Sequence, residues 1–132
     1  MILVDTSVLV DFLAGRETAP CRYLERLVRE QAAFFLAPPV IQEVLQGARD
    51  EAEWRMLNTY LASQMWVGVR DPLQSHVDAA RIYFDCRRRG LTVRSTADCL
   101  IAQIALEHGF ALLHDDRDFE SIRAVRPLST LP

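Results

Sequence analysis

The chain has 132 residues, half of them apolar and a quarter charged, so it is long enough to bury a core as one ordinary globular domain. Its net charge of −3 argues against a globally basic nucleic-acid binder. No apolar run is long enough to span a membrane, and the first apolar segment is too short for a signal peptide. Three widely spaced cysteines fit neither a disulfide framework nor a zinc site, which favours a reducing, cytoplasmic compartment.

Strand-like and helix-like segments alternate along the chain. Apolar runs bounded by turn residues predict four short strands, at residues 2–5, 34–37, 66–69 and 110–113. Helical spacing predicts helices around 7–14, from Pro20, at 40–46 and 50–62, around 77–84, and from Ser95 to a stop at Gly109. This alternation is typical of βαβ units, so we expect an α/β fold with three α/β/α layers and a mainly parallel sheet.

Two of the predicted strands end on acidic residues. Asp5 directly follows the first strand, and Asp115, Asp116 and Asp118 follow the strand at 110–113. Ligands of open parallel sheets bind beyond the carboxyl ends of the strands. Carboxylates gathered at that edge therefore predict a pocket for a hard divalent cation.

Each acid also has an ordinary structural interpretation. Asp5 is suited to cap the helix that follows it, and Glu43 fits the solvent-facing side of its short helix. Ser95 and Asp98 have the spacing of a capping box, and an acid in a first helical turn suits the helix dipole. The acids after the last strand fit a solvated loop. From the residues alone we favour a functional role for Asp5 and leave Asp98 open.

Other catalytic chemistries find no support. The three histidines show no metal-ligand spacing; His108 falls on an apolar helix face, and His114, beside the acids, is only a weak candidate for a phosphate contact. The chain contains no Gly-x-Ser-x-Gly motif, no P-loop and no Gly-x-Gly-x-x-Gly fingerprint. We therefore expect no histidine catalyst and no nucleotide-binding loop.

Taken together, four acidic segments resemble the PIN-domain ribonucleases, in particular the VapC toxins of bacterial toxin–antitoxin pairs. The segments are ILVDTS at 2–7, VIQEVLQG at 40–47, STADCLIA at 95–102 and LLHDDRDF at 112–119. The resemblance implies a single PIN domain over residues 1–132. It also implies an endoribonuclease toxin that uses Mg²⁺ or Mn²⁺ to hydrolyse RNA phosphodiester bonds, forms a homodimer and is neutralised by a cognate VapB-like antitoxin.

The resemblance also assigns roles by position. It implies an acidic catalytic quartet of Asp5, Glu43, Asp98 and Asp116. Direct metal ligands would be Asp5, Asp98 and Asp116, with Asp118 and Glu43 as weaker candidates. Thr6 or Ser7 would orient Asp5 or hydrogen-bond to metal-bound water. Asp115 occupies a place where the family often has a non-acidic residue, which leaves Asp115 and Asp116 as alternatives for the fourth acid.

All 15 basic residues of the chain are arginines, which bind phosphate in bidentate fashion. A compositional bias of the source genome is the simpler explanation for the absence of lysine. Several lie near the predicted acids. We expect phosphate contacts from some of Arg16, Arg87, Arg88, Arg89, Arg94 and Arg117. The alternative for residues 87–89 is an ordinary solvated face.

Two helices have apolar faces with more surface than a small core absorbs, although core packing is the default. One face is formed by Leu24, Leu27 and Val28, and the other by Trp54, Leu57 and Leu61.

Three other functions compete with the ribonuclease interpretation. A phosphatase with Asp5 as nucleophile normally needs a second acid where Ser7 stands. A non-catalytic PIN-like module that binds RNA or protein would be expected to lose acids. A receiver domain needs a lysine.

Overall fold

The computed structural model describes residues 1–131 and has a parallel three-stranded sheet at its centre. The strands are β1 (Ile2–Val4), β2 (Ala111–Leu113) and β3 (Thr130–Leu131), in the order β1-β2-β3. Leu3 is paired with Leu112, and Leu112 with Thr130. The predicted parallel arrangement of the first and last apolar runs is confirmed.

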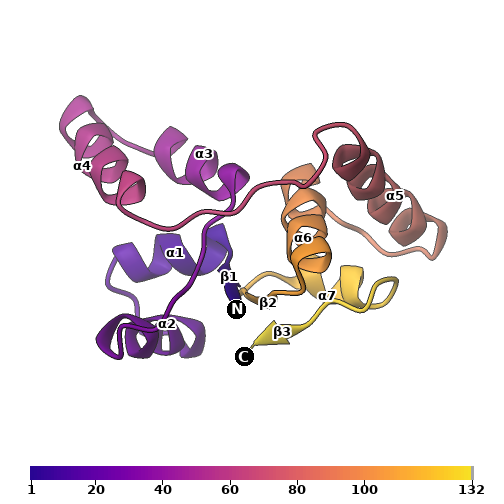
Figure 1. Cartoon of the computed structure of the whole chain (residues 1–132), viewed down its shortest axis with the longest axis horizontal. Coiled ribbons are helices and arrows are strands. Elements are labelled where there is room, and N and C mark those ends of the chain that lie inside the picture. Colours follow the sequence, from indigo (N-terminus) through magenta and orange to yellow (C-terminus); the bar gives the residue numbers. More distant parts are fainter. Residues whose placement is uncertain (132) are drawn as a thin grey trace.

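Helices lie on both sides of this sheet (Figure 1). They are α1 (Thr6–Leu13), α2 (Ala19–Arg29), α3 (Pro38–Gln46), α4 (Glu51–Ala62), α5 (Gln74–Arg88), α6 (Thr96–His108) and α7 (Arg117–Arg123). In the view of Figure 1, α1 to α4 gather on the left and α5 to α7 on the right, with the strands between them. The α/β/α expectation is thus confirmed, and none of the described helices is long and apolar enough to cross a membrane.

Two of the expected strands are reduced to single bridges. Phe35 pairs with Leu3 and Leu36 pairs with Trp66, both in parallel, but neither segment forms a regular strand. The prolines explain the first case, because α3 begins at Pro38 and ends the extended backbone after only a few residues. The Phe35 segment still lies beside β1 and the Trp66 segment beside it in turn, so both continue the sheet in parallel.

The chain after β2 was incompletely predicted. The acidic segment expected to be a loop is the start of α7: Asp116 is its N-cap and accepts a hydrogen bond from the Asp118 N–H. Asp118 and Glu120 lie in the first turn, where acids suit the helix dipole. The short β3 that follows was also missed.

The core holds α6 and the strands in fixed positions. Leu3, Val4, Leu112 and Leu113 are fully buried, and the inward face of α6 packs over them. Gly109 ends α6 as predicted, with a φ of +67°, a left-handed conformation that favours glycine. The strand β2 then starts at Ala111, one residue later than predicted. The packing of α6 against β2 places the first turn of α6, with Asp98, near the carboxyl ends of β1 and β2.

Candidate active site

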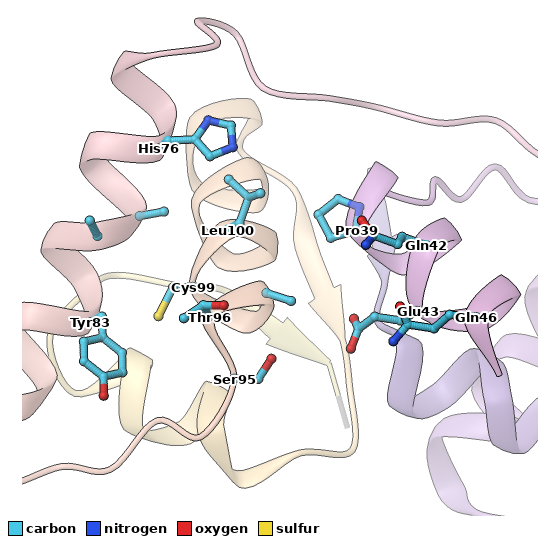
Figure 2. Close-up of a pocket in the computed structure, with 13 residues that line it drawn as sticks. Pro39, Gln42, Glu43, Gln46, His76, Tyr83, Ser95, Thr96, Cys99 and Leu100 are labelled. Atoms are coloured by element: carbon cyan, nitrogen blue, oxygen red, sulfur yellow. The ribbon is translucent and has the colours of Figure 1, made fainter.

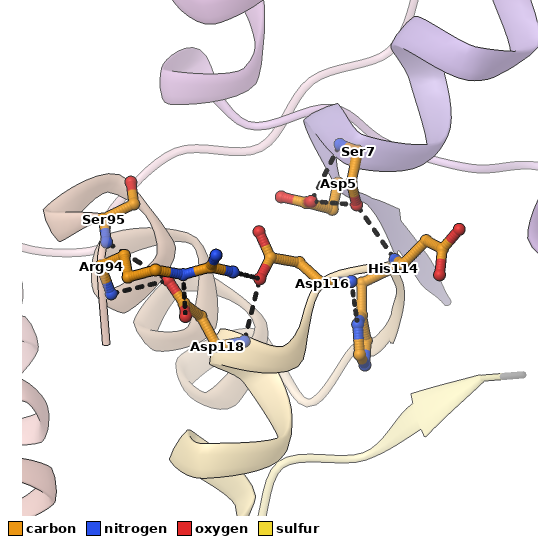
Figure 3. Close-up of polar contacts among 8 residues, drawn as sticks. Asp5, Ser7, Arg94, Ser95, His114, Asp116 and Asp118 are labelled. Atoms are coloured by element: carbon orange, nitrogen blue, oxygen red, sulfur yellow. Dashed lines mark hydrogen bonds and ion pairs between the residues drawn. The ribbon is translucent and has the colours of Figure 1, made fainter. Parts of the chain in front are cut away.

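Carboxylates from four elements meet at this edge of the sheet. Asp5 follows β1, Asp116 lies between β2 and α7, Asp98 is in the first turn of α6, and Glu43 comes from α3. Figure 3 shows Asp5, Asp116 and Asp118 at the ends of their strands and helices, with Arg94 beside them. The structure therefore brings together the residues that the four acidic segments predicted.

Asp5 both caps a helix and offers a free oxygen. Its Oδ2 accepts hydrogen bonds from the Ser7 N–H (3.0 Å) and the Ser7 hydroxyl (2.6 Å), so the capping interpretation is correct. Its Oδ1 is buried without any hydrogen-bond partner among the described residues. Burial is the main cause that raises the pKa of Asp5, partly offset by the Ser7 bonds.

The two hydroxyls after Asp5 make different contacts. Ser7 Oγ donates to Asp5 and accepts the Asp115 N–H at 3.0 Å, so it connects the end of β1 to the segment after β2. Thr6 Oγ1 donates to Glu43 Oε1 at 2.9 Å. The half-buried Glu43 is therefore not the free surface glutamate that its helix alone allowed. Asp115 is exposed and contributes its backbone.

Glu43 also lines a groove between α3, α5 and α6. Its volume is about 540 Å³, and its walls include Gln42, Tyr83 and Ser95. In Figure 2 the Glu43 carboxylate points from α3 toward the start of α6, while Tyr83 stands on the α5 side. Glu43 thus contributes a carboxylate to a groove whose other walls are polar, aromatic and apolar side chains.

Asp98 does not take part in a capping box. Ser95 is the N-cap of α6 but makes no side-chain capping bond, and Asp98 Oδ2 is buried with no hydrogen-bond partner within residues 1–131. Burial, followed by the charges of Asp5 and Asp116, raises the pKa of Asp98 to about 8. An uncompensated buried carboxylate of this kind is a poor structural residue and a good ligand for a cation.

Asp98, Asp116 and Asp118 form the tightest group of acids. Each offers an oxygen, and these oxygens lie within 4.8 Å of one another. Asp118 is 3% exposed; its Oδ2 accepts the backbone N–H groups of Arg94 (2.9 Å) and Ser95 (3.2 Å). Of the two alternatives after β2, Asp116 lies in the acid group and Asp115 does not.

The arginines are more engaged than the sequence suggested. Arg94 forms ion pairs with Asp116 (3.3 Å) and Asp118 (3.4 Å), a pairing that the sequence analysis missed. Arg16 pairs with Asp11, and Arg89 donates to the Ala124 carbonyl at 2.6 Å. The other three predicted contacts are exposed: Arg87, Arg88 and Arg117, of which the first two lie over the rings of Tyr83 and Phe84.

The histidines have structural surroundings. His108 contacts the Gly68 carbonyl at 2.8 Å and packs near Phe110, as expected for the edge of the core. The His114 side chain is 8% exposed and packs on Phe119. Its Nδ1 accepts the Asp116 N–H at 3.2 Å, so His114 supports the backbone of an acid.

The donor set fits a hard divalent cation. Two buried carboxylate oxygens, Asp5 Oδ1 and Asp98 Oδ2, have no hydrogen-bond partner among the described residues, and Asp116 lies beside Asp98. Mg²⁺ and Mn²⁺ bind such oxygen ligands, and Mg²⁺ needs only one or two carboxylates besides water and substrate oxygens. A cation here would compensate the charges that now raise the pKa of Asp98.

The fold and this cluster of acids define a class of protein. Residues 2–125 match the model of the PIN domain, and the chain belongs to the PIN-domain family. Within it the chain belongs with the VapC ribonucleases: it is 36% identical over 129 residues to the VapC ribonuclease Mb1587 of Mycobacterium bovis and, equally, to ribonuclease VapC11 of Mycobacterium tuberculosis. These alignments cover 97% of this chain and 96% of each relative.

Solved structures share the fold at lower identity. VapBC2 from Rickettsia felis, bound to a promoter DNA fragment, has a TM-score of 0.76 at 16% identity and covers 99% of this chain and 98% of its own. FitAcB from Neisseria gonorrhoeae has a TM-score of 0.73 at 20% identity and covers 100% of this chain and 97% of its own. These likenesses support the fold.

Proposed function

We propose that this protein is an endoribonuclease that hydrolyses RNA phosphodiester bonds with Mg²⁺ or Mn²⁺ bound at the acid cluster. The observation that carries the proposal is the pair of buried, unpartnered oxygens on Asp5 and Asp98. A divalent ion bound there supplies a nucleophilic water near neutral pH and stabilises charge on the leaving oxygen. The VapC ribonuclease relatives support RNA as the substrate.

The acidic side chains have different roles. Asp5 and Asp98 hold the ion, each with one oxygen that accepts no hydrogen bond from the described chain. Asp116 is the third ligand or holds the water around it. Glu43, fixed through one oxygen by Thr6, has its carboxylate on the wall of the groove, where it orients water or accepts its proton.

We further propose that the chain binds an antitoxin and, as a homodimer, a second copy of itself. Matched structures include members of the VapBC family of toxin-antitoxin systems, which supports a VapB-like antitoxin for this chain. A homodimer, a cytoplasmic location and a single domain over residues 1–132 stay predictions. A partner that covers the acids and the adjoining groove would block RNA from the site.

Cleavage of RNA tests the proposal directly. Structured and single-stranded RNAs are incubated with the protein in Mg²⁺, in Mn²⁺ or in chelator. We expect cleavage only with metal, and a loss on the order of a hundredfold or more for Asp5→Asn, which removes a ligand. Asp11→Asn, an acid of α1 outside the cluster, is the matched control and should cleave normally.

Two results would contradict this function. Cleavage that persists in chelator and in Asp5→Asn shows a contaminating or different activity. RNA binding without cleavage, with metal bound as measured by calorimetry, would favour the non-catalytic module instead.

A further inference from the structure

Arg94 brings a positive charge of the chain's own into the acid cluster. It lies between α5 and α6, and its guanidinium reaches Asp116 Oδ1 through Nη2 (3.3 Å) and Asp118 Oδ1 through Nε (3.4 Å; Figure 3). These two carboxylates belong, with Asp98, to the group whose oxygens lie within 4.8 Å of one another. Arg94 and a divalent cation would therefore share ligands.

The guanidinium is loosely held. Both of its contacts are longer than the 2.7–2.9 Å of strong charge-assisted hydrogen bonds, and its side chain is 69% exposed. By contrast, Arg126 Nη2 lies 2.9 Å from Asp85 Oδ2 and its side chain is only 26% exposed. The Arg126 pair has the geometry of a fixed link, whereas the Arg94 pairs have that of an exchangeable one.

The acids stay in place without the Arg94 side chain. Asp118 Oδ2 is held by the backbone N–H groups of Arg94 and Ser95, and Asp116 Oδ1 also accepts the Asp118 N–H at 2.9 Å. These bonds anchor the Arg94 backbone to the start of α7. The guanidinium is thus free to leave the acids while its base remains fixed beside them.

We propose that Arg94 is an exchangeable counter-ion: its guanidinium competes with a divalent cation for Asp116 and Asp118, and on metal binding is released to an RNA phosphate next to the site. Two cations on the same carboxylates repel each other, which favours release. A guanidinium is well matched to phosphate, and the fixed backbone keeps it within reach. The second step rests on the proposed ribonuclease function; the first does not.

Mn²⁺ binding to the metal-free protein, followed by electron paramagnetic resonance, tests the competition without any activity assay. We expect Arg94→Gln to bind Mn²⁺ roughly two- to fivefold more tightly than wild type, the range of an exposed ion pair, with a smaller gain at high salt. Arg94→Lys keeps the charge and should stay near wild type. Arg88→Gln, an exposed arginine on α5, is the charge-matched control and should change little.

An unchanged or weaker Mn²⁺ affinity in Arg94→Gln would overturn the competition. So would an equal gain in Arg88→Gln, because the effect would then be one of net charge.

RNA binding tests the release. A labelled single-stranded oligoribonucleotide is titrated by fluorescence anisotropy against Glu43→Gln, which removes the proposed base but keeps the ligands Asp5 and Asp98, with and without Arg94→Gln. In millimolar Mn²⁺ the added substitution should weaken binding about fivefold and reduce the salt slope by about one. In chelator, where Arg94 stays on the acids, it should have little effect.

Equal weakening with and without Mn²⁺ would make Arg94 a permanent phosphate contact and overturn the release. If the protein binds no RNA at all, the proposed function fails, while the Mn²⁺ titration still decides the competition.

Discussion

The negative charge of Asp98 destabilises the folded protein. It is 5% exposed, and its burial together with the charges of Asp5 and Asp116 raises its pKa to about 8. A carboxyl group whose pKa is higher in the folded than in the unfolded chain binds more protons when folded. Between about pH 4 and pH 8, rising pH therefore lowers the free energy of unfolding.

Asp98→Asn should remove this cost. In chelator at pH 8 we expect a free energy of unfolding at least about 1 kcal/mol above that of wild type, since one pKa unit corresponds to ~1.4 kcal/mol. The wild type should lose stability from pH 5.5 to pH 8 more steeply than the variant, while RNA cleavage by the variant is abolished. Urea unfolding at the two pH values measures this.

Asp78→Asn, at a half-buried acid of α5 outside the acid cluster, should keep the wild-type slope. A clear loss of stability in metal-free Asp98→Asn would instead show that Asp98 is mainly a structural residue.

Sequence patterns identified the acids, but not which oxygen of each acid is hydrogen-bonded within the protein and which is free for a metal ion. Capping and metal binding were alternatives for Asp5, yet its Oδ2 caps α1 while its Oδ1 stays free. The capping box of Ser95 and Asp98 fitted by spacing and does not form. The partner of Glu43, Thr6, lies 37 residues away along the chain, so only the fold brings the two together.

At the scale of elements, helices were predicted better than strands. Long apolar periodicity defines α6. The segment around Phe35 has one bridge to each neighbour and the segment around Trp66 has one bridge, too few for regular strands. The extended segment around Phe35 is short because α3 begins at Pro38. The run of acids after β2 predicts a solvated loop, whereas Asp116, a good N-cap residue, begins α7 there.

Ser7 connects two of these elements, and its removal should separate their ends. Ser7→Ala loses the bond to Asp5 Oδ2 and the acceptor of the Asp115 N–H. We expect a stability loss of about 1–2 kcal/mol and Mn²⁺ affinity about tenfold weaker, because Asp5 and the segment with Asp116 lose their common support. Urea unfolding and Mn²⁺ titration measure both.

Ser63→Ala is the matched control, because its hydroxyl is exposed and donates only to the Tyr60 carbonyl at the end of its own helix. Unchanged Mn²⁺ affinity in Ser7→Ala would mean that Asp5 is positioned by β1 alone.

At the scale of the whole molecule, the core absorbs most of the apolar surface that was expected to be in excess. Leu24, Leu27 and Leu61 are buried, while Val28 and Trp54 remain 47% and 43% exposed. More apolar surface is exposed on another face, which runs from the residue before α5 along that helix. Its members are Leu73, Val77 and Phe84, which are 76%, 51% and 37% exposed.

These three residues are spaced by four and seven positions, so they form an apolar strip on one face of the helix. The guanidinium groups of Arg81 and Arg88 lie over the Phe84 ring at its end. We predict that this strip is the contact between two copies of the chain. Val77→Asp places a charge at its centre, where burial without a partner is costly, and should convert the dimer to a monomer at about 10 μM. Val10→Asp, on the equally exposed outer face of α1, should remain dimeric. Multi-angle light scattering distinguishes the two states; a wild-type monomer, or a dimer that survives Val77→Asp, would show that α5 is not the interface.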